Sequence, residues 1–366
     1  MKILHIIDAL TMGGAENLLI GLAGEQVKRG YDVTVAPLVC PSSTPVREKM
    51  EASGVKVKPF KSTGSVYNPF FVFRIAKEIR KYDIVHVHLF PALYWAGLAN
   101  IVTCKRTPFI YTEHSTKNKR RSNKILHATD RFIYQNCYKT IVACSDKALE
   151  TYQEAYPTIT HVCAINNGVD TQIYREALPY TKQELWGIDE NCFAVTMVAR
   201  FMTMKRQDTV VEAISKLPDR IHAVFVGGEE TDEGLIRVKR IAEEKGIINR
   251  IHFMYLRKDV PRILKSSDVV IMASDYEGLS LSSIEGMAAG KPFVATDVDG
   301  LREVVGGAGV LFENKDSEAL SHIINKLSTE TEYYKGVAQR CSNRAEHYDI
   351  KYMVDGYLKV YEKESC

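Results

Sequence analysis

Short apolar runs rich in β-branched residues alternate with amphipathic runs along the whole chain. Apolar runs of about four to eight residues are typical of buried strands, and their alternation with helical runs is typical of parallel α/β sheets. We therefore predict two series of strands. The first comprises residues 3–7, 32–39, 55–60, 83–88, 109–113, 140–144 and 161–165, and the second comprises residues 193–199, 222–226, 250–253, 269–273, 293–296 and 310–312.

The length of the chain and a break in this pattern indicate two domains. At 366 residues the chain is long for one hydrophobic core, because chains beyond about 250–300 residues usually divide. The break lies near Asn167-Gly168-Val169-Asp170, between the two series. We predict two Rossmann-like domains, residues 1–172 and 173–347, which face each other across a cleft. A last helix, over 351–364 and bearing three tyrosines, follows the second domain.

The composition is that of an ordinary globular protein, with 45% hydrophobic and 25% charged residues. Eight scattered cysteines without a CxxC pair favour a reduced, cytosolic location over a disulfide framework or a zinc site. No apolar run reaches the roughly 20 residues that cross a bilayer. We expect a soluble, cytoplasmic protein.

The net charge of +3 is unevenly distributed. Residues 1–170 contain 22 Lys and Arg against 14 Asp and Glu, whereas residues 171–366 contain 26 against 31. The densest basic segment, residues 117–124, is either a solvated loop or a contact for an anionic membrane surface. Nucleic acid is disfavoured, because no aromatic-interleaved platform accompanies the charge.

The most informative segment lies between Glu277 and Glu285, eight positions apart. It follows the predicted strand 269–273 and leads into a helix of small residues that ends before Gly290. Glu277 therefore lies in a strand-to-helix loop and Glu285 inside the helix. Between them, residues 278–282 offer backbone N–H groups at a helix N-terminus, which is a ready anion site. Two carboxylates beside a phosphate cradle suit a nucleotide-sugar.

The first strand is followed by a loop that contains Gly13 and Gly14. These glycines allow a ligand to approach the backbone at the carboxyl end of the strand, although a plain tight turn remains an alternative. The loop is not a GxGxxG motif. The second strand ends in Pro37-Leu38-Val39-Cys40, without an acidic residue for a nicotinamide-cofactor ribose. Both features disfavour a dehydrogenase.

Arg200 ends the first strand of the second series, and Lys205 lies near the start of the next helix. A departing nucleoside diphosphate develops negative charge that such a cation pair would stabilise. Arginine makes bidentate phosphate contacts, and lysine acts as a point charge. Taken alone the pair is weak evidence, since most such residues are solvated.

Three further groups are candidates for metal binding or catalysis. Asp297-Val298-Asp299 has the form of a DxD metal motif, but a loop and helix-cap role is favoured by its position. His86 and His88 share one strand face, and without an evident third ligand strand packing is favoured. His114 ends a strand and points towards the expected cleft. A site role and a core or surface role stay equally open for it.

Taken together, these segments resemble the retaining glycosyltransferases of family 4, which have the GT-B fold of two Rossmann-like domains. The resemblance covers nearly the whole chain. The matching segments are Gly13 to Glu16 (a first glycine loop), Asn167 to Asp170 (an interdomain "NGVD" signature), Arg200 with Lys205 (a phosphate-binding pair), Glu277 to Glu285 (the E-x7-E motif) and residues 290–296 (the strand that follows). In this order and context the set is specific.

The resemblance implies roles for the matching residues. Glu277 would contact the donor sugar or the reacting centre, and Glu285 the ribose. His114 would lie near the transferred sugar and the acceptor. The remaining donor-binding residues that it implies are Arg200, Lys205, Gly278, Leu279, Ser280, Leu281 and Leu256. It also implies that no metal or other cofactor is needed, and that residues 348–366 cross back onto the first, acceptor-binding domain.

Two departures from the family pattern leave the donor base and sugar open. Gly278-Leu279-Ser280-Leu281 replaces the usual Gly-Phe-Gly or Gly-Leu-Pro, and residues 253–256 lack the glycine common in the base-binding loop. The hypothesis is transfer of a hexosyl group, with retention, from a nucleoside-diphosphate-sugar, UDP-linked, to an acceptor hydroxyl in surface polysaccharide or glycolipid assembly. A lipid-linked acceptor would explain the basic first domain, through contact with the inner face of the cell membrane.

Two other functions stay open from the sequence. A non-hydrolysing UDP-sugar 2-epimerase has the same fold, although the E-x7-E motif argues against it. A non-catalytic nucleotide-sugar-binding subunit is disfavoured by the presence of Glu277, Glu285, Arg200 and Lys205. The donor sugar, the acceptor and the oligomeric state are not determined by the sequence.

Overall fold

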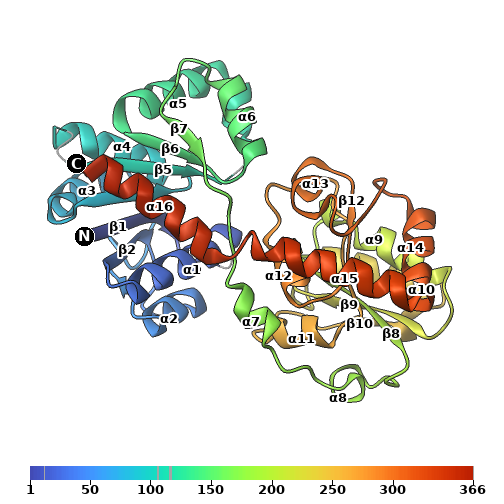
Figure 1. Cartoon of the computed structure of the whole chain (residues 1–366). Helices are drawn as coiled ribbons and strands as arrows, with labels where there is room; N and C mark the ends of the chain where they lie inside the picture. Colours follow the sequence, from blue (N-terminus) through green and yellow to red (C-terminus); the bar gives the residue numbers. More distant parts are fainter. Residues whose placement is uncertain (12, 105–106, 115–117, 366) are drawn as a thin grey trace. The chain divides into compact units, whose positions relative to one another are not determined.

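A computed structural model of the chain describes residues 1–11, 13–104, 107–114 and 118–365 (Figure 1). The chain divides into two compact units. Unit 1 contains Met1–Gly168 and Ile350–Cys366, and unit 2 contains Val169–Asp349. The boundaries expected from the sequence, after residues 172 and 347, lie within a few residues of these. Where the chain enters and leaves unit 2, Val169 N donates to Tyr348 O at 3.0 Å, in a short parallel bridge.

Unit 1 is built on a seven-stranded parallel sheet with the order β3-β2-β1-β4-β5-β6-β7. Its strands are β1 (Lys2–Ala9), β2 (Asp32–Val39), β3 (Lys56–Val57), β4 (Ile84–His88), β5 (Phe109–Glu113), β6 (Thr140–Ala143) and β7 (Val162–Ala164). The order reverses between β1 and β4, and ligands of open α/β sheets bind at such a reversal, beyond the carboxyl ends of the strands.

Unit 2 repeats this arrangement with a six-stranded parallel sheet in the order β10-β9-β8-β11-β12-β13. Its strands are β8 (Phe193–Val198), β9 (Ile221–Val226), β10 (Ile251–Phe253), β11 (Val269–Met272), β12 (Phe293–Thr296) and β13 (Val310–Phe312). Here the order reverses between β8 and β11. The structure thus confirms two parallel-sheet α/β domains.

Every predicted strand is present among the described residues, and apart from one strand each end agrees or is shifted by one or two residues. The exception is the predicted strand 55–60, of which only Lys56–Val57 forms a strand. Pro59 has no N–H group to donate, so the ladder is interrupted there. Lys58 N and Phe60 N still donate to β2, at 2.9 Å each.

Helices join the strands in both units. Unit 1 contains α1 (Gly14–Lys28), α2 (Pro45–Ala52), α3 (Phe71–Glu78), η1 (Ile79–Lys81), α4 (Ala92–Val102), η2 (Lys119–Ser122), α5 (Lys124–Cys137), α6 (Asp146–Ala155) and α16 (Ile350–Ser365). Unit 2 contains α7 (Thr171–Arg175), α8 (Lys182–Trp186), η3 (Thr203–Lys205), α9 (Gln207–Ser215), α10 (Glu233–Glu244), η4 (Ile248–Arg250), α11 (Val260–Ser266), α12 (Leu281–Ala288), α13 (Asp299–Val305), α14 (Ser317–Thr329) and α15 (Thr331–Glu346).

Polar side chains set where several of these helices begin. Thr44, Ser145 and Asn123 each accept a hydrogen bond from a backbone N–H in the first turn of α2, α6 and α5. A cap of this kind satisfies an N–H group that has no partner within the helix. At α8 the Thr181 hydroxyl and the Glu184 carboxylate cap each other's backbone reciprocally.

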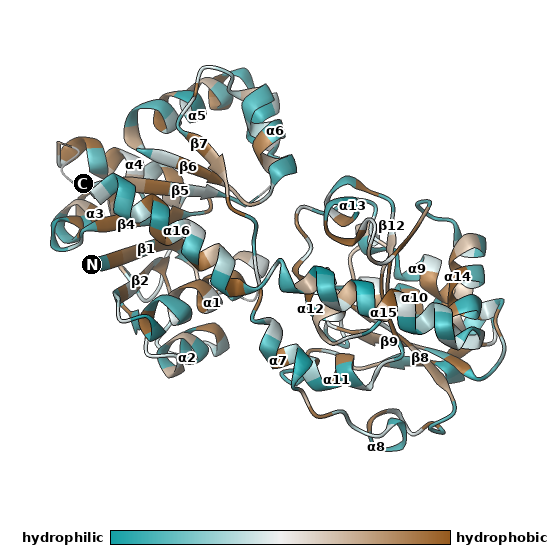
Figure 2. Cartoon of the chain, in the orientation of Figure 1, coloured by the Kyte–Doolittle hydropathy of each residue, from teal (hydrophilic) through white to brown (hydrophobic). Residues whose placement is uncertain are grey.

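The central strands are buried on both faces, whereas the edge strands β3, β7, β10 and β13 are partly exposed. In Figure 2, β1 and β5 are largely hydrophobic, whereas α6 carries long hydrophilic stretches. All five residues of β4 are buried, including two histidines. The C-terminal helix α16 packs against α1 within unit 1, where Arg29 pairs with Asp355. None of the described helices is both long and apolar enough to cross a membrane.

Candidate active site

The cation and carboxylate predicted for unit 2 lie beside the reversal of strand order. Arg200 follows β8, and Lys205 ends the short helix η3 after it. Glu277 lies in the loop that joins β11 to α12. Because β8 and β11 are neighbouring parallel strands, their carboxyl ends bring these segments together. This is the edge at which open α/β sheets bind ligands.

Lys205 and Glu277 form an ion pair, with Lys205 Nζ 2.5 Å from Glu277 Oε1. The side chains are only 17% and 13% exposed. The Ser274 hydroxyl donates to the same carboxylate oxygen at 2.7 Å. Burial weakens solvent screening, so the attraction within this pair is stronger than in most surface ion pairs. The arrangement places one cation and one anion side by side at the carboxyl end of the sheet.

Backbone contacts hold the two loops that carry this pair. Asp275 N donates to Met204 O at 2.7 Å, and Arg206 Nε donates to Asp275 Oδ1 at 2.8 Å. Gly300 allows the start of α13 to approach the same loop, since a Cβ atom at this position would lie 1.5 Å from Gly278 O. The loop conformation therefore depends on the segment after β8, the segment after β11 and the start of α13.

The segment after Glu277 has backbone N–H groups free for a ligand. Gly278, Leu279 and Ser280 precede α12, and their N–H groups donate to no described acceptor. The side chain of Ser280, the N-cap residue, makes no capping bond. Leu281 is the first residue of α12. Unpaired N–H groups at a helix N-terminus carry partial positive charge and attract anions.

Glu285 lies inside α12, where Tyr174 of α7 contacts it. Burial raises the pKa of Glu285, an effect that the Tyr174 hydroxyl partly offsets by donating to the carboxylate. Burial, with Glu285 close by, raises the pKa of Tyr174 well above its usual value. The sequence analysis missed Tyr174. Its position shortly after the NGVD segment was the one available signal.

Two predicted donor-binding residues lie apart from this pair. Arg200 has an exposed side chain, and its backbone is held by Gln207, whose Nε2 donates to Arg200 O at 3.0 Å. Leu256 is 48% exposed in the loop after β10, two strands away from β8. No contact described in the chain joins the side chain of either residue to Glu277.

In unit 1, the glycine loop follows β1 at the reversal between β1 and β4. Gly13 precedes α1, and a Cβ atom there would lie 2.4 Å from Glu16 Oε2. Gly14 is the first residue of α1, and a Cβ atom there would meet nothing within 4 Å. Gly13 is therefore explained by local packing, whereas the open space at Gly14 is compatible with an approaching ligand.

Asp8, near the end of β1, is a further candidate that the sequence analysis missed. Its Oδ1 accepts a hydrogen bond from Ala92 N, the first N–H of α4, at 2.7 Å. Burial raises the pKa of Asp8 to about 7, with a further contribution from Glu16. An acidic residue at the end of an apolar strand, just ahead of a glycine loop, was the signal in the sequence.

His114 follows β5 and is half-buried. Its Nε2 lies 3.1 Å from His88 Nδ1 in the neighbouring strand β4. Burial lowers the pKa of His114 to about 4, so the ring is neutral at physiological pH. The structure therefore links this predicted residue to the histidines of β4.

The histidines of β4 have a third neighbour that the sequence did not reveal. His5 of β1 is paired with His86 in the sheet register, and one nitrogen from each of His5, His86 and His88 can be chosen so that all three lie within 4.8 Å of one another. The expectation that His86 and His88 have no third potential ligand was wrong. His5 was not visible as a partner in the sequence, because 81 residues separate it from His86 along the chain. The preference for packing inside the sheet agrees with the burial of all three.

Asp297 and Asp299, the aspartates of the DxD-like motif, both pair with Arg302. Arg302 Nε donates to Asp297 Oδ1 at 2.6 Å, and the second aspartate begins α13. Arg302 lies 3.4 Å from Asp299 Oδ1. Both carboxylates thus pair with Arg302 of α13, which fits the loop role favoured from the sequence. The helix-cap part of that prediction was wrong, because the N-cap residue of α13 is Val298 and no side chain makes a capping bond there.

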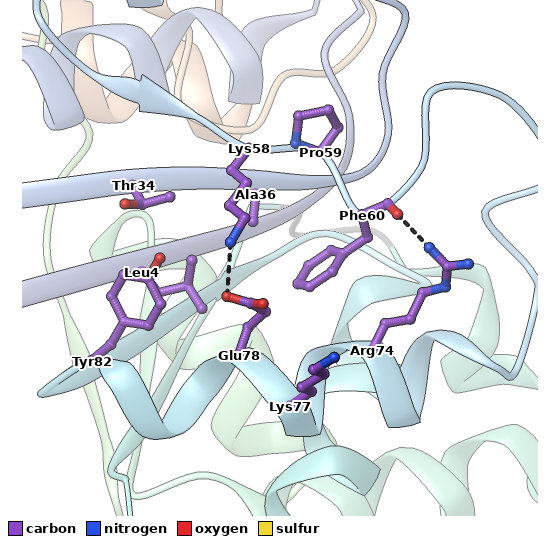
Figure 3. Close-up of a pocket in the computed structure, with 10 residues that line it drawn as sticks. All are labelled: Leu4, Thr34, Ala36, Lys58, Pro59, Phe60, Arg74, Lys77, Glu78 and Tyr82. Atoms are coloured by element: carbon purple, nitrogen blue, oxygen red, sulfur yellow. Dashed lines mark hydrogen bonds and ion pairs between the residues drawn. The ribbon is translucent and has the colours of Figure 1, made fainter.

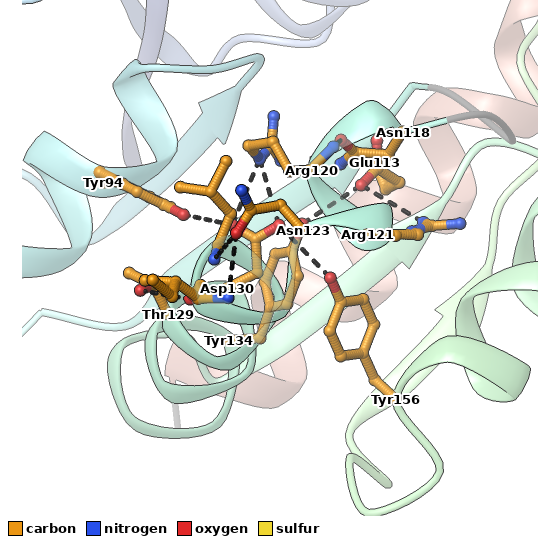
Figure 4. Close-up of polar contacts among 12 residues, drawn as sticks. Tyr94, Glu113, Asn118, Arg120, Arg121, Asn123, Thr129, Asp130, Tyr134 and Tyr156 are labelled. Atoms are coloured by element: carbon orange, nitrogen blue, oxygen red, sulfur yellow. Dashed lines mark hydrogen bonds and ion pairs between the residues drawn. The ribbon is translucent and has the colours of Figure 1, made fainter.

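Two arginines of the basic segment 117–124 are buried in internal ion pairs, whereas Lys124 is exposed. The side chains of Arg120 and Arg121 are only 16% and 12% exposed and pair with the buried carboxylates of Asp130 and Glu113. Figure 4 shows these groups pointing towards one another, together with three tyrosine hydroxyls. Lys117 lies outside the described residues. The two arginines therefore balance internal charge and are neither solvated nor available to lipid.

A pocket of about 410 Å³ in unit 1 lies away from the strand carboxyl ends (Figure 3). It is lined by residues of β1, β2, the segment after β3, and α3 with its C-terminal neighbour: Leu4, Thr34, Ala36, Lys58, Pro59, Phe60, Arg74, Lys77, Glu78 and Tyr82. Lys58 pairs with Glu78 across it at 3.0 Å. The pocket does not include any predicted site residue.

The fold of the chain resembles that of solved structures. HepE of Anabaena, solved in complex with UDP, has a TM-score of 0.86 and 22% identity, with 99% of this chain and 100% of that chain covered. A glycosyltransferase from Rickettsia africae has a TM-score of 0.82 and 23% identity, with 99% and 98% covered. These likenesses define the fold class as GT-B.

The sequence comparisons define the family. Residues 12–173 match the model described as Glycosyltransferase Family 4, and residues 181–347 match that of Glycosyl transferases group 1. An Escherichia coli UDP-Gal:alpha-D-GlcNAc-diphosphoundecaprenol alpha-1,3-galactosyltransferase is 25% identical over 321 residues, covering 83% of this chain and 80% of that protein. The Bacillus subtilis putative glycosyltransferase EpsD is 27% identical over 310 residues, covering 79% and 80%. The chain belongs to the GT-B glycosyltransferases of the family 4 type.

Proposed function

We propose that this glycosyltransferase moves a hexosyl group from a UDP-sugar to an acceptor hydroxyl, with retention at the anomeric carbon. The observation that carries the proposal is the Lys205–Glu277 pair beside the unpaired N–H groups of residues 278–280. The lysine and the N–H groups suit a diphosphate, and the carboxylate suits sugar hydroxyls. The UDP and UDP-glucose complexes of the Anabaena protein, and the UDP-Gal in the name of the E. coli relative, support UDP as the carrier.

Unit 2 would bind the donor along the carboxyl ends of its strands. Lys205 would hold the diphosphate with the N–H groups before α12, and Arg200 would add a second, exposed cation. Glu285 would accept hydrogen bonds from the ribose hydroxyls, with Tyr174 holding the carboxylate. Leu256 would lie beside the base, while Ser280 and Leu281 extend the phosphate cradle.

The reaction breaks the bond between the anomeric carbon and the diphosphate oxygen. The oxygen atom of the acceptor hydroxyl forms the new bond on the same face of the sugar, and the hydroxyl proton passes to the departing phosphate. Lys205 and the N–H groups would stabilise the negative charge that develops on the diphosphate. Glu277 would orient the sugar and stabilise positive charge near the anomeric carbon. No metal ion has a part in this scheme.

Unit 1 would bind the acceptor. Asp8, the open backbone at Gly14 and the half-buried ring of His114 lie at the carboxyl ends of β1 and β5. These groups offer hydrogen-bond donors and acceptors without a fixed cation, which suits a neutral carbohydrate. His114 would contact a hydroxyl of the transferred sugar or of the acceptor.

We further propose that the acceptor is lipid-linked and that unit 1 contacts an anionic membrane at the cytoplasmic face. Tyr67, Phe70 and Phe73 are 62%, 69% and 65% exposed, at and just before α3. Arg74 and Lys77 follow on the same helix. Aromatic side chains beside cations are typical of surfaces that bind anionic lipid. The diphosphoundecaprenol acceptor in the name of the E. coli relative supports this assignment.

Vesicle flotation tests the membrane contact. The protein should float with vesicles that contain phosphatidylglycerol and remain behind with neutral vesicles. A Phe70→Ser/Phe73→Ser variant should lose this binding, whereas Ile236→Ser on α10 of the other unit, an apolar residue that is also exposed, at 55%, should retain it. Equal flotation of the two variants would refute the α3 surface as the contact.

Thermal stabilisation by nucleotides tests the donor site. UDP should raise the melting temperature of the protein in chelator, and GDP, ADP, dTDP and NAD should not. Stabilisation by NAD alone would overturn the proposal. Incubation with UDP-GlcNAc in the absence of an acceptor separates transfer from 2-epimerisation, because only an epimerase would form a new sugar nucleotide.

A further inference from the structure

Four histidines cross the middle of the unit 1 sheet, where polar side chains are unusual. His5 lies in β1, His86 and His88 in β4, and His114 directly after β5. His5 and His86 are 0% exposed and His88 is 1% exposed. A buried polar group without a hydrogen-bond partner is strongly disfavoured, so each ring nitrogen needs a partner.

The hydrogen bonds form one continuous chain that ends at His114. Gln26 Oε1 of α1 lies 2.8 Å from His5 Nε2. His5 Nδ1 lies 3.1 Å from His88 Nε2, and His88 Nδ1 lies 3.1 Å from His114 Nε2. No described residue hydrogen-bonds to the remaining nitrogen, His114 Nδ1, which belongs to the half-buried ring at the end of the chain.

His86 belongs to a separate branch. Its Nδ1 lies 2.6 Å from the Tyr361 hydroxyl of α16, and its Nε2 lies 2.7 Å from the Thr112 hydroxyl. Gln26 Nε2 donates to the same Tyr361 hydroxyl at 3.5 Å. The tyrosine therefore accepts from the amide nitrogen of Gln26, which turns the amide oxygen towards His5.

All four rings are neutral at physiological pH. Burial lowers the pKa of His5 and His114 to about 4, and that of His86 and His88 well below its usual value. A neutral imidazole carries one N–H and one lone pair. In such a chain, the donor at one end determines the tautomer of every ring that follows.

The direction of the chain follows from its first acceptor. The amide oxygen of Gln26 can only accept, so His5 Nε2 carries the proton and His5 Nδ1 offers a lone pair. His88 Nε2 must then donate to His5, which leaves a lone pair on His88 Nδ1. His114 Nε2 donates to that lone pair. The reverse direction would require the Gln26 amide to be turned, with its nitrogen towards His5 and its oxygen towards Tyr361.

We propose that Gln26, His5 and His88 fix His114 as the Nε2–H tautomer, so that its Nδ1 presents a lone pair to a sugar hydroxyl at the carboxyl end of β5. The three residues are positioning residues, and His114 is the residue that contacts the substrate. The tautomer rests on the geometry of unit 1, whereas the hydroxyl contact rests on the proposed function.

Nitrogen-15 spectra of the histidine-labelled full chain test the tautomer directly. At pH 7, without ligand, His5, His88 and His114 should each show a protonated Nε2 and an unprotonated Nδ1. Single His→Gln variants assign the signals. A proton on His114 Nδ1, or a charged His114 ring, would overturn the proposal independently of any activity.

A variant of the first acceptor extends the test. Gln26→Leu should convert His114 into a mixture of tautomers and lower kcat/KM for transfer about three- to ten-fold, while stabilisation by UDP is unchanged. Asn100→Leu is the matched control, because Asn100 is also a buried amide of unit 1, donating to Cys137 O at 2.7 Å. It should leave the His114 tautomer as it is.

Two outcomes distinguish this proposal from its alternatives. If Gln26→Leu changes the tautomer but not kcat/KM, the hydroxyl contact is wrong while the proposed function stands. If one equivalent of Zn²⁺ binds to the wild-type protein and not to His5→Gln, a metal takes the lone pairs of this chain and the tautomer proposal fails. Absence of such binding supports the hydrogen-bonded chain.

Discussion

The two units share a strand order but differ in the chemistry at the reversal of that order. Unit 2 places a lysine, a glutamate and unpaired backbone N–H groups there. Unit 1 places neutral imidazoles and a carboxyl group whose pKa burial raises to about 7. The two sheets, which share one topology around the reversal, thus present fixed charge in unit 2 and mostly neutral hydrogen-bonding groups in unit 1. This difference suits a diphosphate in unit 2 and a carbohydrate hydroxyl in unit 1.

The largest expected effect comes from removing the negative charge of Glu277 in unit 2. Glu277→Gln should lower kcat for transfer about 100-fold or more, because a group that acts on transition-state charge contributes roughly 10²–10³. Steady-state transfer assays with calorimetric UDP titration check this, and the UDP affinity should change little. Glu318→Gln is the control, since Glu318 is an exposed carboxylate that also pairs with a lysine. Equal kcat values for the wild type and Glu277→Gln would remove the proposed role.

The next effect concerns glycines at the two reversals. Gly300→Ala should destabilise the protein by about 2–3 kcal/mol and weaken UDP binding, because the new Cβ atom collides with Gly278 O. Gly14→Ala has open space and should raise stability by about 0.5 kcal/mol while it lowers transfer.

Denaturant unfolding and UDP titration of both variants measure these changes. A Gly300→Ala protein with normal UDP affinity would show that the loop before α12 does not depend on α13. Unchanged transfer by Gly14→Ala would show that no ligand approaches the backbone of the glycine loop.

A smaller effect concerns the pH dependence of stability in unit 1. Burial lowers the pKa of His5 and His114 to about 4, so the folded state binds fewer protons than the unfolded state between about pH 4 and 6.5. Their contribution to stability is therefore lost as the pH falls through this range. Burial raises the pKa of Asp8 to about 7, so its contribution has the opposite sign and is lost as the pH rises from about 4 to 7.

Asp8→Asn removes the opposing contribution. The variant should therefore lose more stability than the wild type on acidification from pH 7 to 5, by on the order of 1–2 kcal/mol. Urea unfolding at both pH values measures the difference. Parallel losses in the two proteins would mean that Asp8 titrates in its ordinary range.

The smallest effect is expected at the DxD-like motif of unit 2. Asp297→Asn leaves the Lys205–Glu277 pair untouched, so transfer in the presence of chelator should change less than about two-fold, within the range of ordinary surface substitutions. Activity assays with EDTA, and with added Mg²⁺ or Mn²⁺, check this. Activity restored to an EDTA-treated protein by a divalent ion, and not to the variant, would return this motif to the site.

The sequence by itself determined the strands and the order of the candidate segments. Apolar β-branched runs specify strands locally, and the loop from Glu277 to Glu285 is positioned by the strand before it and the helix after it. The predicted strand 55–60 was too long, because only Lys56–Val57 forms a strand. Whether a residue belongs to a strand depends on its hydrogen bonds with the neighbouring strand, which a local pattern does not show. For the candidate donor site of unit 2, the roles of the individual residues came from the family resemblance.

Only the tertiary structure decided which polar groups face one another. Arg120 and Asp130, Tyr174 and Glu285, and His5 with the histidines of β4 are separated along the chain and meet through sheet register or helix packing. A local pattern shows that a residue is charged or lies in a buried strand, but not which partner balances it. For that reason the basic segment looked exposed in the sequence although its two arginines are paired inside unit 1. The hydrogen-bonded histidine chain was likewise visible only in the folded sheet.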